Sequence, residues 1–326
     1  MRELEFFIHP GYGKTGTSFL QEKIFSRIGF TNLGKTFSNN RLKEYQYKVF
    51  IPKYNLDPIY PFNIQEDLKK YILEIENTIN NSNTNKIIFS DEVMFDKINY
   101  LGDYNIYLLK EIIEKLREKY KINLNFIITI RNQSDVIAPT FAYNYHRQKK
   151  NFKTIDNYIK QILTDKNLAQ IFYYNELIDK IKKNFSPKIL ILPYEELVKN
   201  FDNYVKKLES FLNTSFQDIN LKNEFINKNH VIKDGQKFWY TNDLKISNIY
   251  LLASSIHRNL KKQSTYYEKI HSRLNFIKKL ISPKTKKIGL IKISVKQKNL
   301  LKEHFKESNK KLASDYNIDL EKLGYF

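Results

Sequence analysis

Short apolar runs recur along the first two thirds of the chain, and segments with a helical spacing of apolar residues separate them. Each run shows little alternation between apolar and polar positions. Such runs are typical of strands that are buried on both faces of a sheet. The predicted strands are Glu5–Ile8, Lys86–Phe89, Leu124–Ile130 and Lys188–Leu192.

Apolar residues spaced three and four positions apart predict amphipathic helices between these runs. Their apolar faces extend over Phe19–Ile28, Leu68–Ile79 and Leu108–Tyr120. Strands that alternate with helices favour right-handed βαβ crossovers and a mainly parallel sheet flanked by helices. We therefore predict an α/β fold, in which ligands bind beyond the carboxyl ends of the strands.

The other segments have weaker patterns. Lys35–Asn63 contains prolines and little periodicity, so we expect an irregular excursion over the sheet. After Leu192 the spacing becomes helical, and no internal repeat or sharp change in composition marks a second domain. We expect one domain over residues 1–326 with a helical, basic part at about 220–326. The helices predicted after Leu192 are Glu195–Leu212, Leu244–Leu260, Tyr266–Leu280 and Val295–Tyr316.

The composition narrows the class of protein. With 326 residues and 41% hydrophobic residues the chain can bury a sizeable core. It contains no apolar run of the length that a membrane span needs, and its first residues do not read as a signal peptide, so we expect a cytoplasmic protein. The absence of cysteine excludes disulfides, a thiolate nucleophile and cysteine-ligated metals.

The net charge of +20 is concentrated late in the chain, because Lys222–Lys311 contains 22 Lys and Arg residues against 6 Asp and Glu residues. One explanation is a lysine-rich composition that accompanies the abundant Asn, Ile, Tyr and Phe. The functional explanations are an acidic acceptor, peripheral contact with an anionic membrane surface, or a nucleic acid. No recognised nucleic-acid-binding motif accompanies the charge, so we expect no nucleic-acid partner.

The segment His9–Ser18 carries the clearest chemistry. It reads HPGYGKTGTS and follows a predicted strand, so a Gly-rich turn with a lysine leads into a helix that begins with hydroxyl residues. Backbone N–H groups and the positive end of a helix dipole bind anions of phosphate size at such a place. The nucleotide-triphosphate loop pattern requires a glycine where this chain has Ile8, so that pattern fails.

The segment instead resembles the 5′-phosphosulfate loop of bacterial sulfotransferases that use 3′-phosphoadenosine 5′-phosphosulfate (PAPS). The resemblance implies that Lys14 meets the charge developing on the leaving group, and that the loop holds the 5′-phosphate. Because that phosphate is already positioned, a metal is not required. The implied donor-binding residues of the loop are Gly13, Lys14, Thr15, Gly16, Thr17 and Ser18.

Arg131 follows the longest predicted strand, and it matches the arginine with which sulfotransferases bind the 3′-phosphate of the donor. The family has a serine eight positions later, where this chain has Pro139, so Thr140 is suggested as a substitute. The stretch at 191–197 resembles another family block, which implies that Tyr194 approaches the adenine. The alternative for Arg131 is a salt bridge at a strand end.

An acceptor hydroxyl needs a base, since its pKa lies far above 7. Resemblance to bacterial carbohydrate sulfotransferases, which have a Ser-Ser-Glu stretch at a similar position, favours Glu92 as the base and Asp91 as the second candidate. His9 could contact the sulfate or act as base, although a lone histidine at a strand end is more often structural. The strand ending in Asp91-Glu92 also reads as a magnesium-binding Walker B strand.

The preferred hypothesis is a sulfotransferase that moves a sulfuryl group from PAPS to a hydroxyl of a glycan or glycolipid acceptor. The alternative is a P-loop kinase or NTPase that uses Lys14, Thr15 and Asp91 with magnesium. A nucleic-acid-binding protein is the third hypothesis, and the oligomeric state is left open by the sequence.

Overall fold

The chain divides into two compact units. A computed structural model describes residues 1–26, 29–34, 64–91, 94, 103–216, 230–233, 236–245 and 284–326. The first unit comprises residues 1–137, 159–227 and 294–326. The second comprises residues 138–158 and 228–293.

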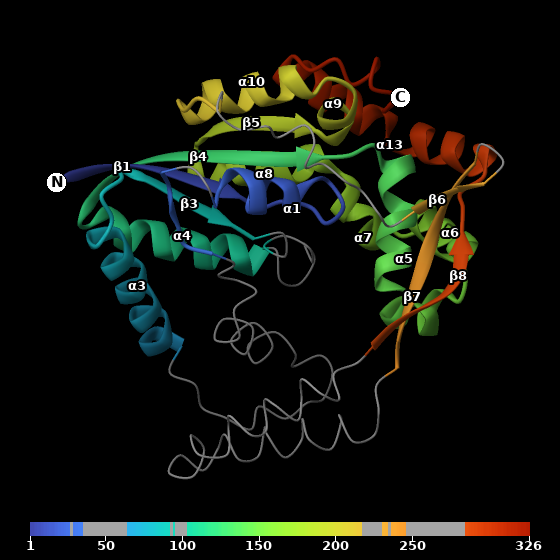
Figure 1. The fold of residues 1–326 in the computed structure, drawn as a ribbon, viewed down its shortest axis with the longest axis horizontal. Helices are drawn as coiled ribbons and strands as arrows, with labels where there is room; N and C mark the ends of the chain where they lie inside the picture. Colours follow the sequence, from blue (N-terminus) through green and yellow to red (C-terminus); the bar gives the residue numbers. More distant parts are fainter. Residues whose placement is uncertain are drawn as a thin grey trace, which may run out of the picture. The chain divides into compact units, whose positions relative to one another are not determined.

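The first unit contains a five-stranded sheet with the strand order β2-β3-β1-β4-β5 (Figure 1). All pairings between its neighbouring strands are parallel. The strands are β1 (Arg2–His9), β2 (Thr31–Asn32), β3 (Lys86–Ser90), β4 (Tyr120–Ile130) and β5 (Lys188–Pro193). The four strands predicted from the apolar runs are therefore confirmed, together with the mainly parallel sheet, and β2 is a short addition at its edge.

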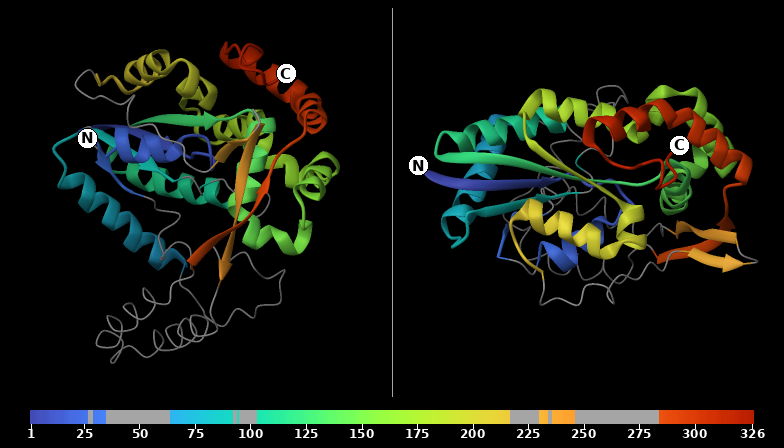
Figure 2. Two further views of the ribbon diagram at one scale, coloured as in Figure 1. Left: turned by 45° about the vertical axis from the view of Figure 1, so that its right-hand side comes forward. Right: turned by 90° about the horizontal axis from the view of Figure 1, so that it is seen from above.

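Helices cover both faces of this sheet, as Figure 2 shows. Leu4, Phe6 and Ile8 of β1 belong to one buried cluster, whereas Phe7 belongs to the cluster on the opposite face. This explains why the strands lack alternation, since both faces are buried. The helices that contribute to the first cluster are α3 (Ile64–Asn80), α4 (Asp103–Arg117), α8 (Tyr174–Phe185) and α13 (Val295–Tyr316).

The opposite face is covered by the helical segments nearest the Gly-rich loop. Phe19, Leu20 and Ile24 are buried there, as their helical spacing predicted, and Ile28 lies outside the described residues. The segments on this face are α1 (Thr17–Phe19), the π-helical η1 (Leu20–Ile24), α9 (Tyr194–Lys199) and α10 (Phe201–Leu212).

The expected helix at Glu195–Leu212 forms as two helices, because the backbone leaves the helical conformation at Asn200 between α9 and α10. The expected helix Val295–Tyr316 is confirmed with the same bounds. Ser294 begins it with a capping box, in which the Ser294 hydroxyl accepts from the Gln297 N–H and the Gln297 side chain accepts from the Ser294 N–H.

Three strands form an antiparallel sheet in the second unit, within the part that the sequence predicted as helical. The prediction that a helix begins at Leu244 is wrong at its start, because Leu244 and Lys245 are the last two residues of a strand. β-Branched and aromatic residues such as Phe238, Trp239 and Tyr240 favour strands. The strands are β6 (His230–Lys233), β7 (Gln236–Lys245) and β8 (Lys284–Ile291), in that order. Residues 246–283, with the expected helix Tyr266–Leu280, lie outside the described residues, as does 35–63.

Trp239 of β7 is buried in the second unit against Ala138 and Ala142, with Ile291 and Ile293 packed beside them. Among the described residues no helix has the length and apolarity needed to cross a membrane. The remaining helices are α5 (Gln133–Phe152), α6 (Ile155–Thr164), α7 (Lys166–Ala169) and the 3₁₀ helix η4 (Gln170–Phe172).

Candidate functional site

The loop between β1 and α1 places two residues in the left-handed region, Lys14 with φ 69° and Gly16 with φ 92°. A non-glycine residue in this conformation is uncommon and persists where the surrounding structure holds it. Gly16 is the N-cap of α1, and its carbonyl accepts from the N–H of Phe19 at 3.0 Å. The first N–H groups of a helix have no partner within the helix, so this loop presents donors to an anion.

Two glycines let this loop pack closely against its neighbours. A Cβ at Gly16 would lie 2.9 Å from Leu197 Cδ2 and 3.4 Å from Tyr194 Cδ2. A Cβ at Gly11 would lie 2.1 Å from Thr17 Cγ2 and 3.0 Å from the His9 ring. Gly13 has open space at the same position. Glycine at positions 11 and 16 therefore allows the loop backbone to lie close to neighbouring side chains, whereas no atom lies near the corresponding position of Gly13.

Thr15 anchors the loop to the sheet. It is fully buried, and its hydroxyl donates to the Tyr12 carbonyl at 2.6 Å. The same oxygen lies 2.7 Å from the Thr129 hydroxyl of β4. Because the single Thr15 hydroxyl proton goes to Tyr12, Thr129 is the donor in the second bond. The Thr15 hydroxyl therefore stabilises the loop, and the group of Thr15 that a ligand could contact is its backbone N–H. Ser18, the last residue of the predicted donor-binding segment, is exposed.

Arg131 joins the loop to the end of β4. Its side chain is 3% exposed, and its Nη1 donates to the Lys14 carbonyl at 2.9 Å. Its guanidinium lies over the Tyr194 ring, 4.3 Å from the ring centroid. The structure thus brings Arg131 and Tyr194, which lie far from the loop in the sequence, against Lys14 and Gly16. At the strand end Arg131 thus contacts a backbone carbonyl and an aromatic ring.

Glu195 is a buried carboxylate beside Arg131 that the sequence analysis missed. One of its oxygens accepts from the Asn132 N–H at 3.0 Å, and the other accepts from the Tyr325 hydroxyl at 2.8 Å. Burial raises the pKa of Glu195, and the two hydrogen bonds and the nearby Arg131 charge partly offset this shift. In the sequence, Glu195 is recognisable only as an acidic residue in the first turn of a predicted helix. That pattern does not distinguish a buried carboxylate from an exposed one.

His9 is fully buried at the end of β1. Its Nδ1 lies 2.7 Å from the Ser90 hydroxyl, which also accepts from Gln21 Nε2 at 3.0 Å. Burial lowers the pKa of His9 to about 3, so the ring is neutral at pH 7. These features favour a structural role for His9, because a group of such low basicity accepts a proton poorly.

The carboxylates after β3 are described only in part. Asp91 is fully buried, and its N–H donates to the His9 carbonyl at 3.1 Å. Glu92, the base that the sequence favours, lies outside the described residues. Thr140 lies on α5 in the second unit and is half-buried. Within the described ranges, no group of three or more His, Asp or Glu residues is arranged to hold a metal ion.

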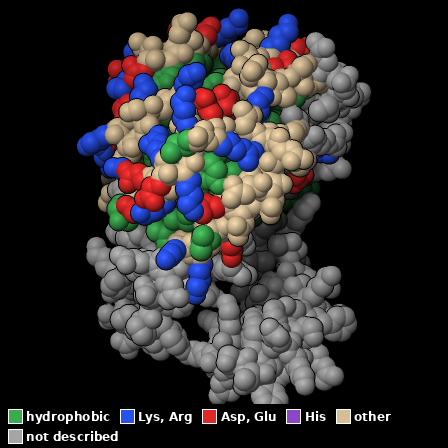
Figure 3. All heavy atoms as spheres, turned by 90° about the vertical axis from the view of Figure 1, so that its left-hand side faces the viewer, with side chains coloured by type: hydrophobic (Ala, Val, Ile, Leu, Met, Phe, Trp, Pro, Cys, Tyr) green, Lys and Arg blue, Asp and Glu red, His purple; other side chains and the backbone are tan. Residues whose placement is uncertain are grey.

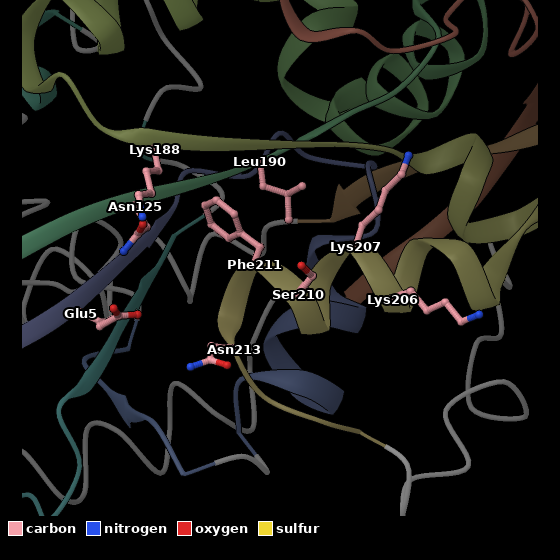
Figure 4. Close-up of a pocket in the computed structure, with 9 residues that line it drawn as sticks. All are labelled: Glu5, Asn125, Lys188, Leu190, Lys206, Lys207, Ser210, Phe211 and Asn213. Atoms are coloured by element: carbon pink, nitrogen blue, oxygen red, sulfur yellow. The ribbon is translucent and has the colours of Figure 1, made fainter.

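A pocket of about 660 Å³ lies on the same face of the sheet as α10 (Figure 4). Its lining comes from β1, β4, β5 and α10 with Asn213, and it includes no residue of the loop at 9–18. Lys207 contributes to the wall but already donates to both oxygens of Glu196, at 2.7 and 2.8 Å. The lining residues are Glu5, Asn125, Lys188, Leu190, Lys206, Lys207, Ser210, Phe211 and Asn213.

Charges of both signs are mixed on the described surface. Figure 3 shows one face, on which basic and acidic side chains are interspersed. Several lysines of α13 are paired with acids: Lys298 lies 2.8 Å from Asp135, and Lys306 lies 3.3 Å from Glu303. Exposed pairs of this kind contribute little to stability, but they reduce the positive potential along α13. Much of the basic segment 222–311 lies outside the described residues.

Comparison with known proteins gives one clear match. Residues 7–267 match the model of a family described as the sulfotransferase domain. None of the curated proteins matches the chain.

Solved structures give weaker similarities. A sulfotransferase from Alicyclobacillus acidocaldarius is 11% identical, with a TM-score of 0.38 over 83% of this chain and 96% of that one. The sulfotransferase domain from the curacin biosynthetic pathway is 14% identical, with a TM-score of 0.35 over 70% of this chain and 79% of that one. The sulfotransferase domain from the Synechococcus PCC 7002 olefin synthase is 12% identical, with a TM-score of 0.37 and coverages of 70% and 80%.

Proposed function

The chain belongs to the sulfotransferase family, and on this basis we propose that it transfers a sulfuryl group from PAPS to an acceptor hydroxyl. The observation that carries the choice of donor is the 2.9 Å hydrogen bond from Arg131 to the Lys14 carbonyl. It holds the arginine proposed for the 3′-phosphate against the loop proposed for the 5′-phosphosulfate. An enzyme that uses ATP needs the loop alone, since ATP has no 3′-phosphate.

Each part of the loop has a role in this proposal. The N–H groups of residues 13–18 and the dipole of the following helix bind the 5′-phosphate. The Lys14 ammonium stabilises the charge that develops on the oxygen between phosphorus and sulfur as the bond to sulfur breaks. Arg131 binds the 3′-phosphate through a planar, permanently charged guanidinium. The Tyr194 ring supports that guanidinium and borders the adenine.

The reaction is a direct displacement. The acceptor oxygen bonds to sulfur as the bond between sulfur and the 5′-phosphate oxygen breaks, and the acceptor proton passes to a carboxylate. The products are a sulfate ester and adenosine 3′,5′-bisphosphate. We assign the proton to Glu92 and name Asp91 as the second candidate, because burial makes His9 a poor base. No metal takes part in the proposed steps.

A binding experiment tests the choice of donor. Adenosine 3′,5′-bisphosphate without metal is expected to raise the thermal unfolding temperature, since a ligand at about 100 times its Kd stabilises the folded state by about 2.7 kcal/mol. Mg-ATP is the comparison. Stabilisation by Mg-ATP alone would contradict the proposal and favour a P-loop kinase or NTPase.

Variants test the residue roles. Lys14→Ala is expected to abolish transfer, and Glu92→Gln is expected to keep donor binding while losing turnover. Lys199→Ala, at an exposed position of α9, is the control for the loss of a lysine. If Glu92→Gln keeps most of the rate and Asp91→Asn does not, Asp91 is the base.

The acceptor in this proposal is a glycan or glycolipid, and the basic residues 222–311 also suit peripheral contact with an anionic membrane surface. Transfer of radiolabelled sulfate from the donor to fractions of a cell-envelope extract tests the acceptor class. Label in the polysaccharide or lipid fraction is expected. Label confined to small hydroxyl compounds would contradict this acceptor class and leave the sulfuryl transfer itself intact.

A further inference from the structure

Lys14 has a strained backbone conformation that no helix end explains. Its φ of 69° lies in the left-handed region, which is unfavourable for a residue with a Cβ. The other non-glycine residues with positive φ in the described ranges each directly follow the last residue of a helix, where a left-handed residue is common. They are Lys153 after α5, Ser186 after α8, Asn213 after α10 and Asn317 after α13. Lys14 instead lies between β1 and α1.

A hydrogen bond from Arg131 meets the backbone of Lys14. Arg131 Nη1 donates to the Lys14 carbonyl at 2.9 Å. A donor that carries a full charge makes a stronger hydrogen bond than a neutral one. The Arg131 side chain is buried and lies over the Tyr194 ring, so the donor is itself held in place.

The backbone of Arg131 is also held. Its carbonyl accepts from the Tyr174 hydroxyl at 2.6 Å. The next residue, Asn132, donates through its N–H to Glu195 at 3.0 Å and through Nδ2 to the Gly324 carbonyl at 2.5 Å. Arg131 is thus fixed at its backbone and at its guanidinium, and a group fixed in this way can hold the carbonyl of a loop residue.

Thr15 anchors the same turn in a different way. Its hydroxyl donates to the Tyr12 carbonyl and accepts from Thr129. These bonds hold the side chain of Thr15, whereas the bond from Arg131 holds the carbonyl of Lys14 itself. Removal of the guanidinium therefore separates the two contributions.

We propose that Arg131 is a positioning residue for the loop, which keeps Lys14 in the left-handed conformation through the Lys14 carbonyl. The directions of the Lys14 side chain and of the N–H groups after it depend on this conformation. Arg131 therefore contributes to the binding of a ligand that has no 3′-phosphate. This ligand effect rests on the proposed function, whereas the effect on the Lys14 backbone does not.

A set of unfolding measurements without ligand tests the backbone effect. Lys14→Gly and Lys14→Ala both remove the ammonium, but only glycine adopts the left-handed conformation without strain. The equilibrium constants of urea unfolding are expected to favour Lys14→Gly over Lys14→Ala by about 5- to 30-fold more with Arg131 present than in combination with Arg131→Met. The greater freedom of glycine in the unfolded chain is the same in both backgrounds, so it cancels.

Calorimetry with adenosine 5′-monophosphate, which has no 3′-phosphate, tests the ligand effect. Arg131→Met keeps a long side chain and lacks the N–H donors, and it is expected to raise the Kd of this ligand about tenfold, the effect of one charged hydrogen bond. Lys14→Gly is expected to reduce that rise, and Lys14→Ala is not. Tyr174→Phe is the control, because it removes the bond to the Arg131 carbonyl and leaves the guanidinium. It is expected to lower stability without changing the Kd.

Arg131→Ala repeats both measurements without the long side chain, should the methionine variant not fold. An equal difference between Lys14→Gly and Lys14→Ala with and without the guanidinium would overturn the inference and assign the conformation to the Thr15 anchor. An unchanged Kd of the monophosphate, with weaker binding of adenosine 3′,5′-bisphosphate, would limit Arg131 to the 3′-phosphate and also overturn it. If the unmodified protein binds neither nucleotide, the proposed function fails, and the unfolding measurements still decide whether Arg131 holds Lys14.

Discussion

Replacing Gly16 by alanine is expected to disturb the loop in two ways. The φ of 92° lies in the left-handed region, where an L residue with a Cβ is less stable by about 1–2 kcal/mol. The added Cβ would lie 2.9 Å from Leu197 Cδ2 and 3.4 Å from Tyr194 Cδ2, and such overpacking costs about 1–3 kcal/mol. Leu197 is buried and cannot move freely, so the two costs add. We expect a loss of about 2–5 kcal/mol in the free energy of unfolding.

The same change at Gly29 is the control, because a Cβ there meets nothing within 4 Å and its φ is not positive. Gly29→Ala is expected to be neutral or to stabilise the protein by up to about 1 kcal/mol through the unfolded chain. Urea unfolding at constant pH measures both variants, and calorimetry with adenosine 3′,5′-bisphosphate shows whether Gly16→Ala also loses donor affinity. Equal unfolding free energies for the two variants would refute the conformational and packing argument for Gly16.

Two further predictions concern buried polar groups of the site. Thr15→Val removes the hydroxyl that donates to the Tyr12 carbonyl and contacts Thr129, so a loss of about 1–3 kcal/mol is expected in thermal unfolding, whereas Thr15→Ser should recover most of it. For His9, whose folded pKa of about 3 lies below the usual 6.5, the unfolded state binds a proton first as the pH falls. Its stabilisation is therefore complete above about pH 6.5 and is lost towards pH 3, by about 1.4 kcal/mol per pH unit. His9→Gln should flatten that part of the stability profile, and an unchanged slope in acid unfolding would contradict the neutral, buried histidine.

The sheet could be predicted from the sequence because burial on both faces leaves continuous apolar runs, such as Leu124–Ile130 in β4. The helix Val295–Tyr316 could be predicted because its cap and its apolar spacing are both local. The strands β6–β8 were missed, since basic and polar residues are interspersed through them and weaken the alternation that marks a strand.

The candidate site likewise contains features that the local sequence predicts and contacts that it does not. The loop around Lys14 and the arginine at the end of β4 are local motifs, and each follows a strand that the pattern reveals. The inward direction of the Thr15 hydroxyl depends on Thr129, which lies 114 positions away along the chain. The link between Glu195 and Tyr325 spans 130 positions. No local spacing encodes such contacts, because they exist only after the sheet and the last helix have packed.

The bond between Asn132 and Gly324 also has a consequence for the order in which the protein is made. Its two residues are 192 positions apart, which corresponds to about 10–40 s of synthesis at about 5–20 residues per second. During that interval Arg131 and Glu195 emerge before residues 320–326. The nascent chain therefore has its Gly-rich loop and the five strands before it has Leu320 and Tyr325 of the core, and the contacts at the end of β4 become complete only as the last of these residues leaves the ribosome.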